Sequence, residues 1–175
     1  MTHTLTPAAD QATDIDDLAR LLTPDGERIS DPDLDRWIEG IDADTLRGLY
    51  RDMAIARRAD AEGIALQRQG QLGLWAPAQG QEAVQIGTAR ACRDDDFLFP
   101  SYREVGVVIT RGATPADTVM AWRGEELSTY DPYDLNMAGM QIIIGAQSLH
   151  ATGYAMGIQR DGGDQVAVAY FGDGA

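Results

Sequence analysis

One short apolar segment, residues 165–171, restricts the possible folds more than any other stretch of the sequence. It is rich in valine and aromatic residues, and it has the length of a strand that is buried on both faces of a parallel sheet. Gly172-Asp173-Gly174 follows directly. Because ligands of open α/β sheets bind beyond the carboxyl ends of the strands, this boundary is a candidate site.

The residue types at this boundary suit a phosphate and a metal ion. Glycines allow backbone N–H groups to approach an oxyanion, and Asp173 presents a carboxylate between them. A carboxylate repels phosphate oxygens unless a cation lies between the two, and Mg²⁺ prefers one or two carboxylates together with phosphates. An ordinary turn is the alternative interpretation of the same residues.

A second motif, Ser101-Tyr102-Arg103-Glu104, follows a short predicted strand at residues 97–99 and Pro100. Ser101 and Glu104 have the spacing of a capping box, which predicts a helix with Tyr102 and Arg103 in its first turn. An arginine fork and a phenol at a helix start would form a phosphate clamp. The alternative is a surface arginine beside a packed tyrosine.

The remaining pattern predicts an α/β fold with a parallel sheet flanked by helices. Asp44 is the expected N-cap of a long amphipathic helix. Residues 124–140 have no clear period and are expected to form a loop. The predicted helices cover residues 45–70, 81–91, 114–123 and 146–158.

The segment before this domain, residues 1–44, has a different composition. It contains repeated acidic residues, three prolines and few large apolar side chains. Such a segment buries too little surface to offset its ordering entropy, so we expect a mobile acidic arm. The predicted organisation is therefore an arm at residues 1–44 and a domain at residues 45–175.

Composition excludes several classes of function. The 28 acidic residues against 14 basic ones give a net charge of −14, which argues against nucleic-acid or anionic-membrane partners. The sequence has no lysine, so neither a P-loop lysine nor a Schiff base is available within these residues. No apolar stretch approaches the roughly 20 residues of a membrane span, and a cytoplasmic location is expected.

Four motifs in a fixed order resemble one known family. They lie within about residues 45–175 and are similar to the alpha subunit of the decarboxylating component of 2-oxo acid dehydrogenase complexes, whose members use pyruvate or branched-chain 2-oxo acids. The motifs are Gly70-Gln-Leu-Gly with Ala76-Pro and Gly80-Gln-Glu-Ala83, Pro100-Ser-Tyr-Arg-Glu104, Gln141-Ile-Ile-Ile-Gly-Ala-Gln147, and Tyr170-Phe-Gly-Asp-Gly-Ala175.

The resemblance implies a thiamine diphosphate enzyme that requires Mg²⁺. Tyr102 and Arg103 match the pair that binds the diphosphate in that family. Asp173 matches the metal ligand, and the backbone of Gly174 and Ala175 matches groups next to the diphosphate. Ile144 matches an apolar residue that wedges the cofactor between its two rings, and the backbone of Ile142 and Ile144 would face the pyrimidine.

The resemblance also implies partners and a reaction. An α2β2 heterotetramer with a beta subunit, which supplies the activating glutamate, would decarboxylate a 2-oxo acid oxidatively and pass the acyl group to a lipoyl arm of the dihydrolipoyl transacylase core. The family's later Asn-Asn pair and histidine loop would lie beyond Ala175. An acetoin dehydrogenase alpha subunit, or a truncated and catalytically silent partner-binding subunit, are the alternatives. Trp75, in the loop before Gly80, bears on the choice of substrate.

Overall fold

The computed structural model describes residues 19–124 and 129–175. The chain divides into two compact units between Asp42 and Ala43. The part of the expected acidic arm that covers residues 1–18 lies outside the described residues, as do residues 125–128 of the expected loop.

Residues 19–42 of the first unit contain local structure. An antiparallel bridge joins Leu22 and Arg28, and helix α1 (Pro32–Ile38) follows. The side chain of Asp31 caps α1 by accepting hydrogen bonds from the backbone N–H groups of Asp33 and Leu34. The second half of the expected arm thus has a short helix of its own, and the mobility of the arm stays a prediction.

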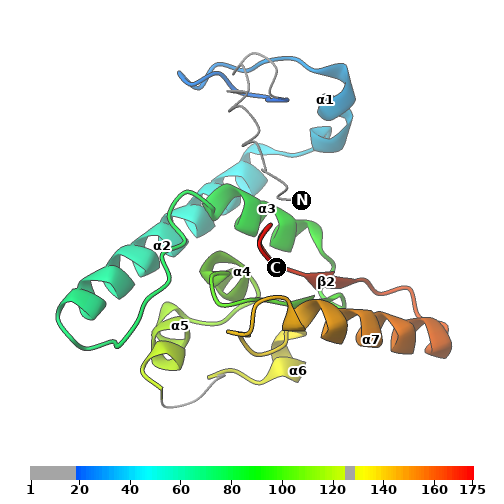
Figure 1. The fold of residues 1–175 in the computed structure, drawn as a ribbon. Helices are drawn as coiled ribbons and strands as arrows, with labels where there is room; N and C mark the ends of the chain where they lie inside the picture. The colour runs from blue at the N-terminus through cyan, green and yellow to red at the C-terminus, as the bar shows by residue number, and fades with distance from the viewer. Residues whose placement is uncertain (1–18, 125–128) are drawn as a thin grey trace, which may run out of the picture. The chain divides into compact units, whose positions relative to one another are not determined.

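The second unit is rich in helix and contains a small parallel sheet (Figure 1). The four predicted helices are confirmed, but Asp44 is not an N-cap, because the long helix begins at Ala43 and places Asp44 in its first turn. Residues 124–140 are not wholly a loop, since a one-turn helix forms within them. The elements are α2 (Ala43–Arg68), α3 (Glu82–Ala91), β1 (Phe97–Phe99), α4 (Val105–Thr110), α5 (Pro115–Trp122), α6 (Pro132–Leu135), α7 (Ala146–Asp161) and β2 (Ala167–Ala169).

Strands β1 and β2 pair in parallel, with Leu98 opposite Val168. Leu98 is fully buried and also forms a parallel bridge to Met137. The predicted strand at residues 165–171 is shorter than expected and half-buried, because β1 is the only strand paired with β2 among the described residues. The α/β prediction therefore holds for a small sheet in a helix-rich unit.

Alternate side chains of β1 face two different layers, as the period of a strand requires. Phe97 and Phe99 pack against Ala151 of α7, and the Phe97 ring lies 4.4 Å from that of Tyr154. Leu98 faces the other way, into a cluster that includes residues of α3 and α4. Figure 1 shows this arrangement, with α7 along one side of the strands and α3 and α4 on the other.

A buried carboxylate fixes the loop between α2 and α3. Asp60 is 2% exposed, and its Oδ1 accepts hydrogen bonds from Nε1 of Trp75 at 3.0 Å and from the backbone N–H of Ala78 at 2.9 Å. The Trp75 ring lies directly over Gly63 of α2, where a Cβ would be 2.5 Å from Cζ2 and closer still to Cε2 and Cδ2. Only glycine permits this contact.

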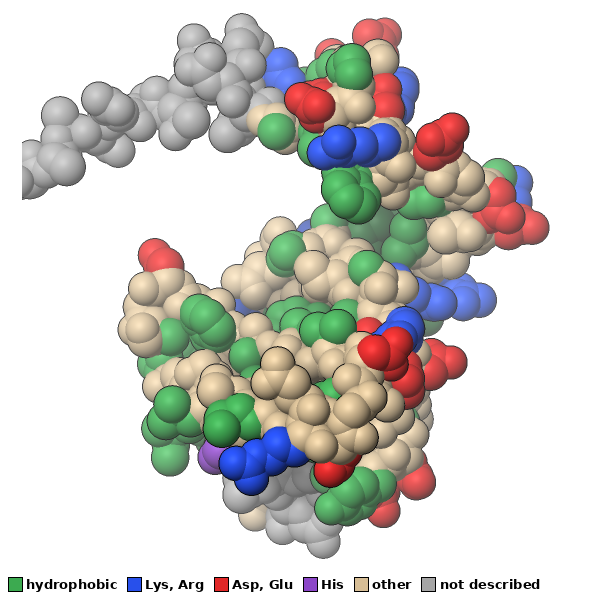
Figure 2. All heavy atoms as spheres, turned by 90° about the vertical axis from the view of Figure 1, so that its right-hand side faces the viewer, with side chains coloured by type: hydrophobic (Ala, Val, Ile, Leu, Met, Phe, Trp, Pro, Cys, Tyr) green, Lys and Arg blue, Asp and Glu red, His purple; other side chains and the backbone are tan. Residues whose placement is uncertain are grey.

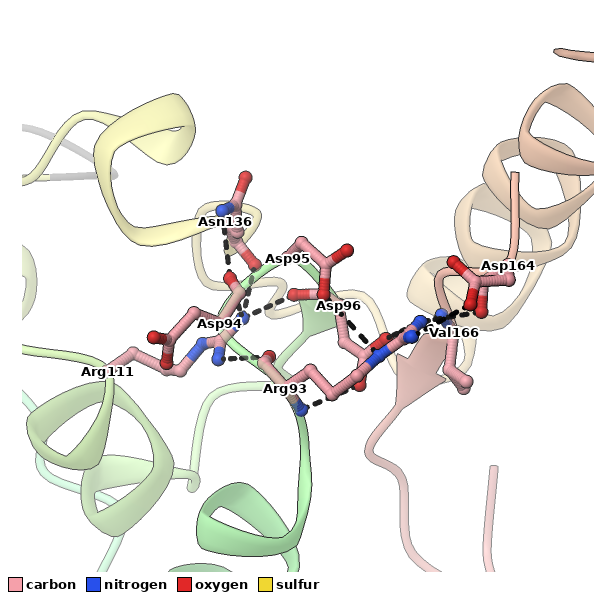
Figure 3. A network of polar contacts seen from close by, with 8 residues as sticks. All are labelled: Arg93, Asp94, Asp95, Asp96, Arg111, Asn136, Asp164 and Val166. Carbon is pink, nitrogen blue, oxygen red and sulfur yellow. Dashed lines mark hydrogen bonds and ion pairs between the residues drawn. The ribbon is translucent and has the colours of Figure 1, made fainter. Parts of the chain in front are cut away.

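A polar network holds the amino end of β1 to the start of β2 (Figure 3). Asp96 is 4% exposed and accepts hydrogen bonds from the backbone N–H groups of Arg93 and Val166 at 2.8 and 2.7 Å. Burial raises the pKa of Asp96, but these bonds outweigh it and leave the pKa below its usual value. The Arg111 guanidinium donates to the backbone carbonyls of Arg93, Asp94, Asp96 and Asn136. At the amino end of the sheet, the carboxylate of Asp96 and the guanidinium of Arg111 are therefore engaged in hydrogen bonds within the protein.

No helix in the described ranges combines the length and the apolar character needed to cross a lipid bilayer. On the face of residues 43–175 seen in Figure 2, the arginine side chains form small separate groups among acidic and hydrophobic ones.

Candidate functional site

The opposite, carboxyl end of the sheet brings two predicted motifs together. Because β1 and β2 are parallel, the segments that leave them, Pro100–Glu104 and Tyr170–Ala175, emerge at the same edge. The backbone N–H of Tyr170 donates to the carbonyl of Phe99 at 3.0 Å, which continues the pairing beyond the strands. Beyond this bond neither segment continues as a strand.

The segment after β1 forms a tight turn, and the predicted capping box is wrong in one respect. The backbone N–H of Ser101 donates to Oε2 of Glu104 at 2.7 Å, as in a capping box, but α4 begins only at Val105. Glu104 has φ −84° and ψ 48°, and the N–H of Val105 donates to the carbonyl of Arg103 at 2.9 Å, which is an inverse γ-turn. Tyr102 and Arg103 therefore lie in a turn before the helix.

The side chains of this turn combine a cation, a phenol and a half-buried carboxyl group. The Arg103 guanidinium lies over the Tyr102 ring, 5.4 Å from its centroid, and donates to the carbonyl of Pro77. A guanidinium has five N–H donors, so these contacts leave capacity for an anion. Burial raises the pKa of the Glu104 carboxyl above its usual value.

A cavity of about 550 Å³ lies between the two segments. Its volume is within the range of about 300–1,000 Å³ that is typical of small-molecule sites. Helix α3 forms one wall and the end of β2 another, so the Tyr-Arg turn and the start of Gly-Asp-Gly face the same space. The residues that line it are Gln81, Val84, Gln85, Thr88, Ser101, Tyr102, Arg103, Glu104, Val168, Ala169, Tyr170, Phe171 and Gly172.

The segment after β2 ends in a second turn. The backbone N–H of Ala175 donates to the carbonyl of Gly172 at 3.1 Å, which places Asp173 and Gly174 at the exposed centre of the turn. The strand end before this turn is held by Gln147, a fully buried residue of α7 whose Nε2 donates to the carbonyl of Tyr170 at 2.5 Å. Gly172 lines the cavity and Asp173 follows it directly.

The isoleucine motif lies beside this second turn rather than in the cavity. Ile142 and Ile144 are 54% and 58% exposed. Gly145, which caps α7, is next to Ala175: a Cβ built on Gly145 would lie 3.8 Å from the Cβ of Ala175. The hydroxyl of Ser101 donates to the carbonyl of Gln141 at 3.4 Å. The three predicted groups are thus neighbours, although their roles in binding stay predictions.

The donor set suits a metal–diphosphate pair better than a metal held by protein alone. The described residues contain no cluster of three or more His, Cys, Asp or Glu side chains that could hold a metal ion. Asp173 would supply one carboxylate, and Mg²⁺ accepts such a site when phosphate oxygens and water complete its coordination. Tyr102 and Arg103 line the cavity and would supply the matching donors for phosphate.

Two features of the site were not predicted from the sequence. Trp75, expected to bear on the choice of substrate, is 4% exposed and packs into α2, so its ring does not reach the cavity. Gln85, which no motif indicated, lines the cavity and bonds to the turn. A polar residue among the small and apolar residues on the buried side of α3 is the signal that could have drawn attention to it.

Comparisons with known proteins agree on one family. Residues 50–175 match the model of the Dehydrogenase E1 component family. The 3-methyl-2-oxobutanoate dehydrogenase subunit alpha of Mycobacterium tuberculosis (strain CDC 1551 / Oshkosh) is 43% identical over 156 residues, which are 89% of this chain and 42% of that protein. The pyruvate dehydrogenase E1 component subunit alpha of Bacillus subtilis (strain 168) is 41% identical over 131 residues, 75% of this chain and 35% of that protein.

The corresponding subunit of Staphylococcus epidermidis (strain ATCC 35984 / DSM 28319 / BCRC 17069 / CCUG 31568 / BM 3577 / RP62A) is 35% identical over 158 residues, 90% of this chain and 42% of that protein. The chain thus spans less than half the length of these curated relatives. The family model covers most of the chain, including both segments that border the cavity. The protein belongs to the Dehydrogenase E1 component family.

Proposed function

We propose that the complete protein is the alpha subunit of a thiamine-diphosphate-dependent 2-oxo acid dehydrogenase. The observation that carries the proposal is the cavity at the carboxyl edge of the sheet, which the Tyr102-Arg103 turn and Gly172, the neighbour of Asp173, line together. A cation and a phenol at the cavity wall, with the Asp173 carboxylate directly after Gly172, are the groups that a metal-bound diphosphate would use.

Each residue has a defined part in this proposal. Arg103 and Tyr102 hold the diphosphate from the α3 side of the cavity, and Asp173 holds Mg²⁺ from the other. The backbone of Gly174 and Ala175 would lie next to the diphosphate, Ile144 would wedge the cofactor between its two rings, and the backbone of Ile142 and Ile144 would face the pyrimidine. When bound, thiamine diphosphate supplies the electron sink for decarboxylation of a 2-oxo acid.

A partner subunit is part of the proposal because α7 carries an uncovered surface. Leu149 and Met156 are 76% and 54% exposed, and a Cβ on Gly153 or Gly157 would meet nothing within 4 Å. Glycines within a helix cost about 1 kcal/mol each, and close packing of another helix against them would offset that cost. We assign this face to contact with a beta subunit in an α2β2 assembly. The assembly would pass the acyl group to the lipoyl arm of a transacylase core.

The relatives' names point to two substrates, pyruvate and 3-methyl-2-oxobutanoate, at nearly equal identity. We therefore propose the 2-oxo acids as the substrate class. The test is a titration of the complete subunit, co-expressed with a beta subunit, with thiamine diphosphate in the presence of Mg²⁺, followed by CO₂ release from both acids. Saturable binding and CO₂ release from either acid support the proposal, and no binding overturns it.

A further inference from the structure

A buried glutamine on α3 connects that helix to the turn that carries Tyr102 and Arg103. Gln85 is 4% exposed. Its Nε2 donates to the carbonyl of Arg103 at 3.1 Å, and its Oε1 accepts a hydrogen bond from the backbone N–H of Gly106 at 2.8 Å. One amide group therefore bonds to the backbone on both sides of Glu104, before and after the turn.

The turn depends on this amide because it has few hydrogen bonds of its own. The carbonyl of Arg103 has two lone pairs, and its two donors are the N–H of Val105 and Nε2 of Gln85. Helix α4 approaches α3 closely at Gly106. A Cβ on Gly106 would lie 3.0 Å from Oε1 and 3.1 Å from Cβ of Gln85.

The orientation of the amide is itself fixed. Nε2 of Gln85 also donates to Oε1 of Gln81 at 3.1 Å, one helical turn earlier. With Oε1 committed to Gly106 and Nε2 to two acceptors, the amide has one orientation that satisfies all its neighbours. A side chain of equal volume without an amide would fill the same space and would leave the position of the Arg103 backbone undetermined.

We propose that Gln85 is a positioning residue that sets the backbone of Arg103 and thereby the place at which its guanidinium meets a diphosphate in the cavity. The inference rests on the proposed function. It goes beyond it in assigning the geometry of the anion site to a residue of α3 that acts through Arg103.

The test is a double-mutant cycle on the complete subunit with its beta partner, with the dissociation constant for thiamine diphosphate at saturating Mg²⁺ as the measurement. Gln85→Met keeps the volume and removes all three side-chain hydrogen bonds described above. It is expected to weaken binding about tenfold in the parent and less than twofold in an Arg103→Ala background, because the bonds act through Arg103. An equal loss in both backgrounds, or no loss in the parent, overturns the proposal.

A second variant and a second measurement separate positioning from stability. Gln85→Glu keeps the acceptor for Gly106 and replaces the Nε2 donor to Arg103 and Gln81 by a carboxylate oxygen, so we expect its loss of affinity to depend on Arg103 in the same way. Hydrogen exchange of the unliganded protein should become faster at residues 101–106 in both variants. Ala89→Gly, on the same helix and 3% exposed, is the matched control. It should lower the melting temperature and leave both the affinity and this exchange unchanged.

The two hypotheses fail in different ways. A parent protein that does not bind thiamine diphosphate overturns the proposed function. A parent that binds, together with Gln85 variants that bind equally well, overturns only the assignment of Gln85. Faster exchange across the whole of α3 and α4 in the Gln85 variants, with no loss of affinity, would likewise show a residue that only stabilises the fold.

Discussion

The contact between Gly63 and Trp75 makes a prediction whose sign is unusual for a helix. Replacing glycine by alanine in a helix interior normally stabilises by about 1 kcal/mol. At Gly63 the added Cβ would lie 2.5 Å or less from three atoms of the Trp75 ring. Such overpacking costs about 1–3 kcal/mol and sometimes more. We therefore expect Gly63→Ala to destabilise the chain.

The magnitude follows from what Trp75 would lose by moving. The ring is 4% exposed, and its Nε1 donates to Asp60, a carboxylate that is 2% exposed. A hydrogen bond to a charged group contributes about 1.5–3 kcal/mol. After the helix-propensity gain of about 1 kcal/mol is deducted from overpacking and the lost hydrogen bond, the expected net loss for Gly63→Ala is about 1.5–5 kcal/mol.

Gly48 of the same helix provides the matched control, because a Cβ there would meet nothing within 4 Å. Gly48→Ala should raise the free energy of unfolding by about 1 kcal/mol. The assay is urea unfolding followed by circular dichroism. The midpoints can be compared if the slope of the free energy of unfolding against urea concentration is the same in all variants. If Gly63→Ala proves as stable as the parent, the ring and its loop move aside at no cost, and the reasoning is refuted.

Three further outcomes are expected. Arg103→Ala should weaken thiamine diphosphate binding by about 1.5–3 kcal/mol, the contribution of a charge-assisted bond, whereas the exposed Arg68→Ala should not; equal calorimetric affinities for the two variants would count against the clamp. Asp173→Asn should weaken binding with Mg²⁺ present and change it little without Mg²⁺, and equal losses in both titrations would contradict a metal role. The hydrogen bond from Arg57 lowers the pKa of Glu82 to about 2. Because the folded-state pKa is depressed, its stabilisation is complete above about pH 4.5 and is lost as the pH falls towards 2, so Glu82→Gln should flatten the fall in melting temperature over that interval.

Local signals in the sequence were sufficient where the bonds themselves are local. Thr114 and Asp117 form both hydrogen bonds of a capping box, and α5 begins at Pro115 as predicted. Ser101 and Glu104 have the same spacing, yet only one of the two bonds forms there. At that turn the carbonyl of Arg103 accepts a hydrogen bond from Gln85, whose amide lies on another helix. No window of neighbouring residues contains that information.

The candidate site divides in the same way. The two segments that border the cavity could be predicted because each follows a strand of apolar residues, and a parallel sheet brings carboxyl ends together. The burial of Trp75 could not be predicted. It depends on contact with Gly63 and on a hydrogen bond to Asp60, a carboxylate of α2 that no sequence pattern identifies as buried. The exposure of Ile142 and Ile144 could not be predicted from the sequence either, since apolar side chains are normally expected to be buried.

The parallel pairing of β1 with β2 has a consequence for synthesis on the ribosome. Phe97 pairs with Ala167, and Asp96 receives its bond from Val166, so the sheet joins positions seventy residues apart. At about 5–20 residues per second, β1 waits roughly 4–14 seconds for its neighbour to be translated. During that interval its phenylalanines have no partner strand, and a nascent chain halted before Val166 should therefore be a target for chaperones that bind apolar segments.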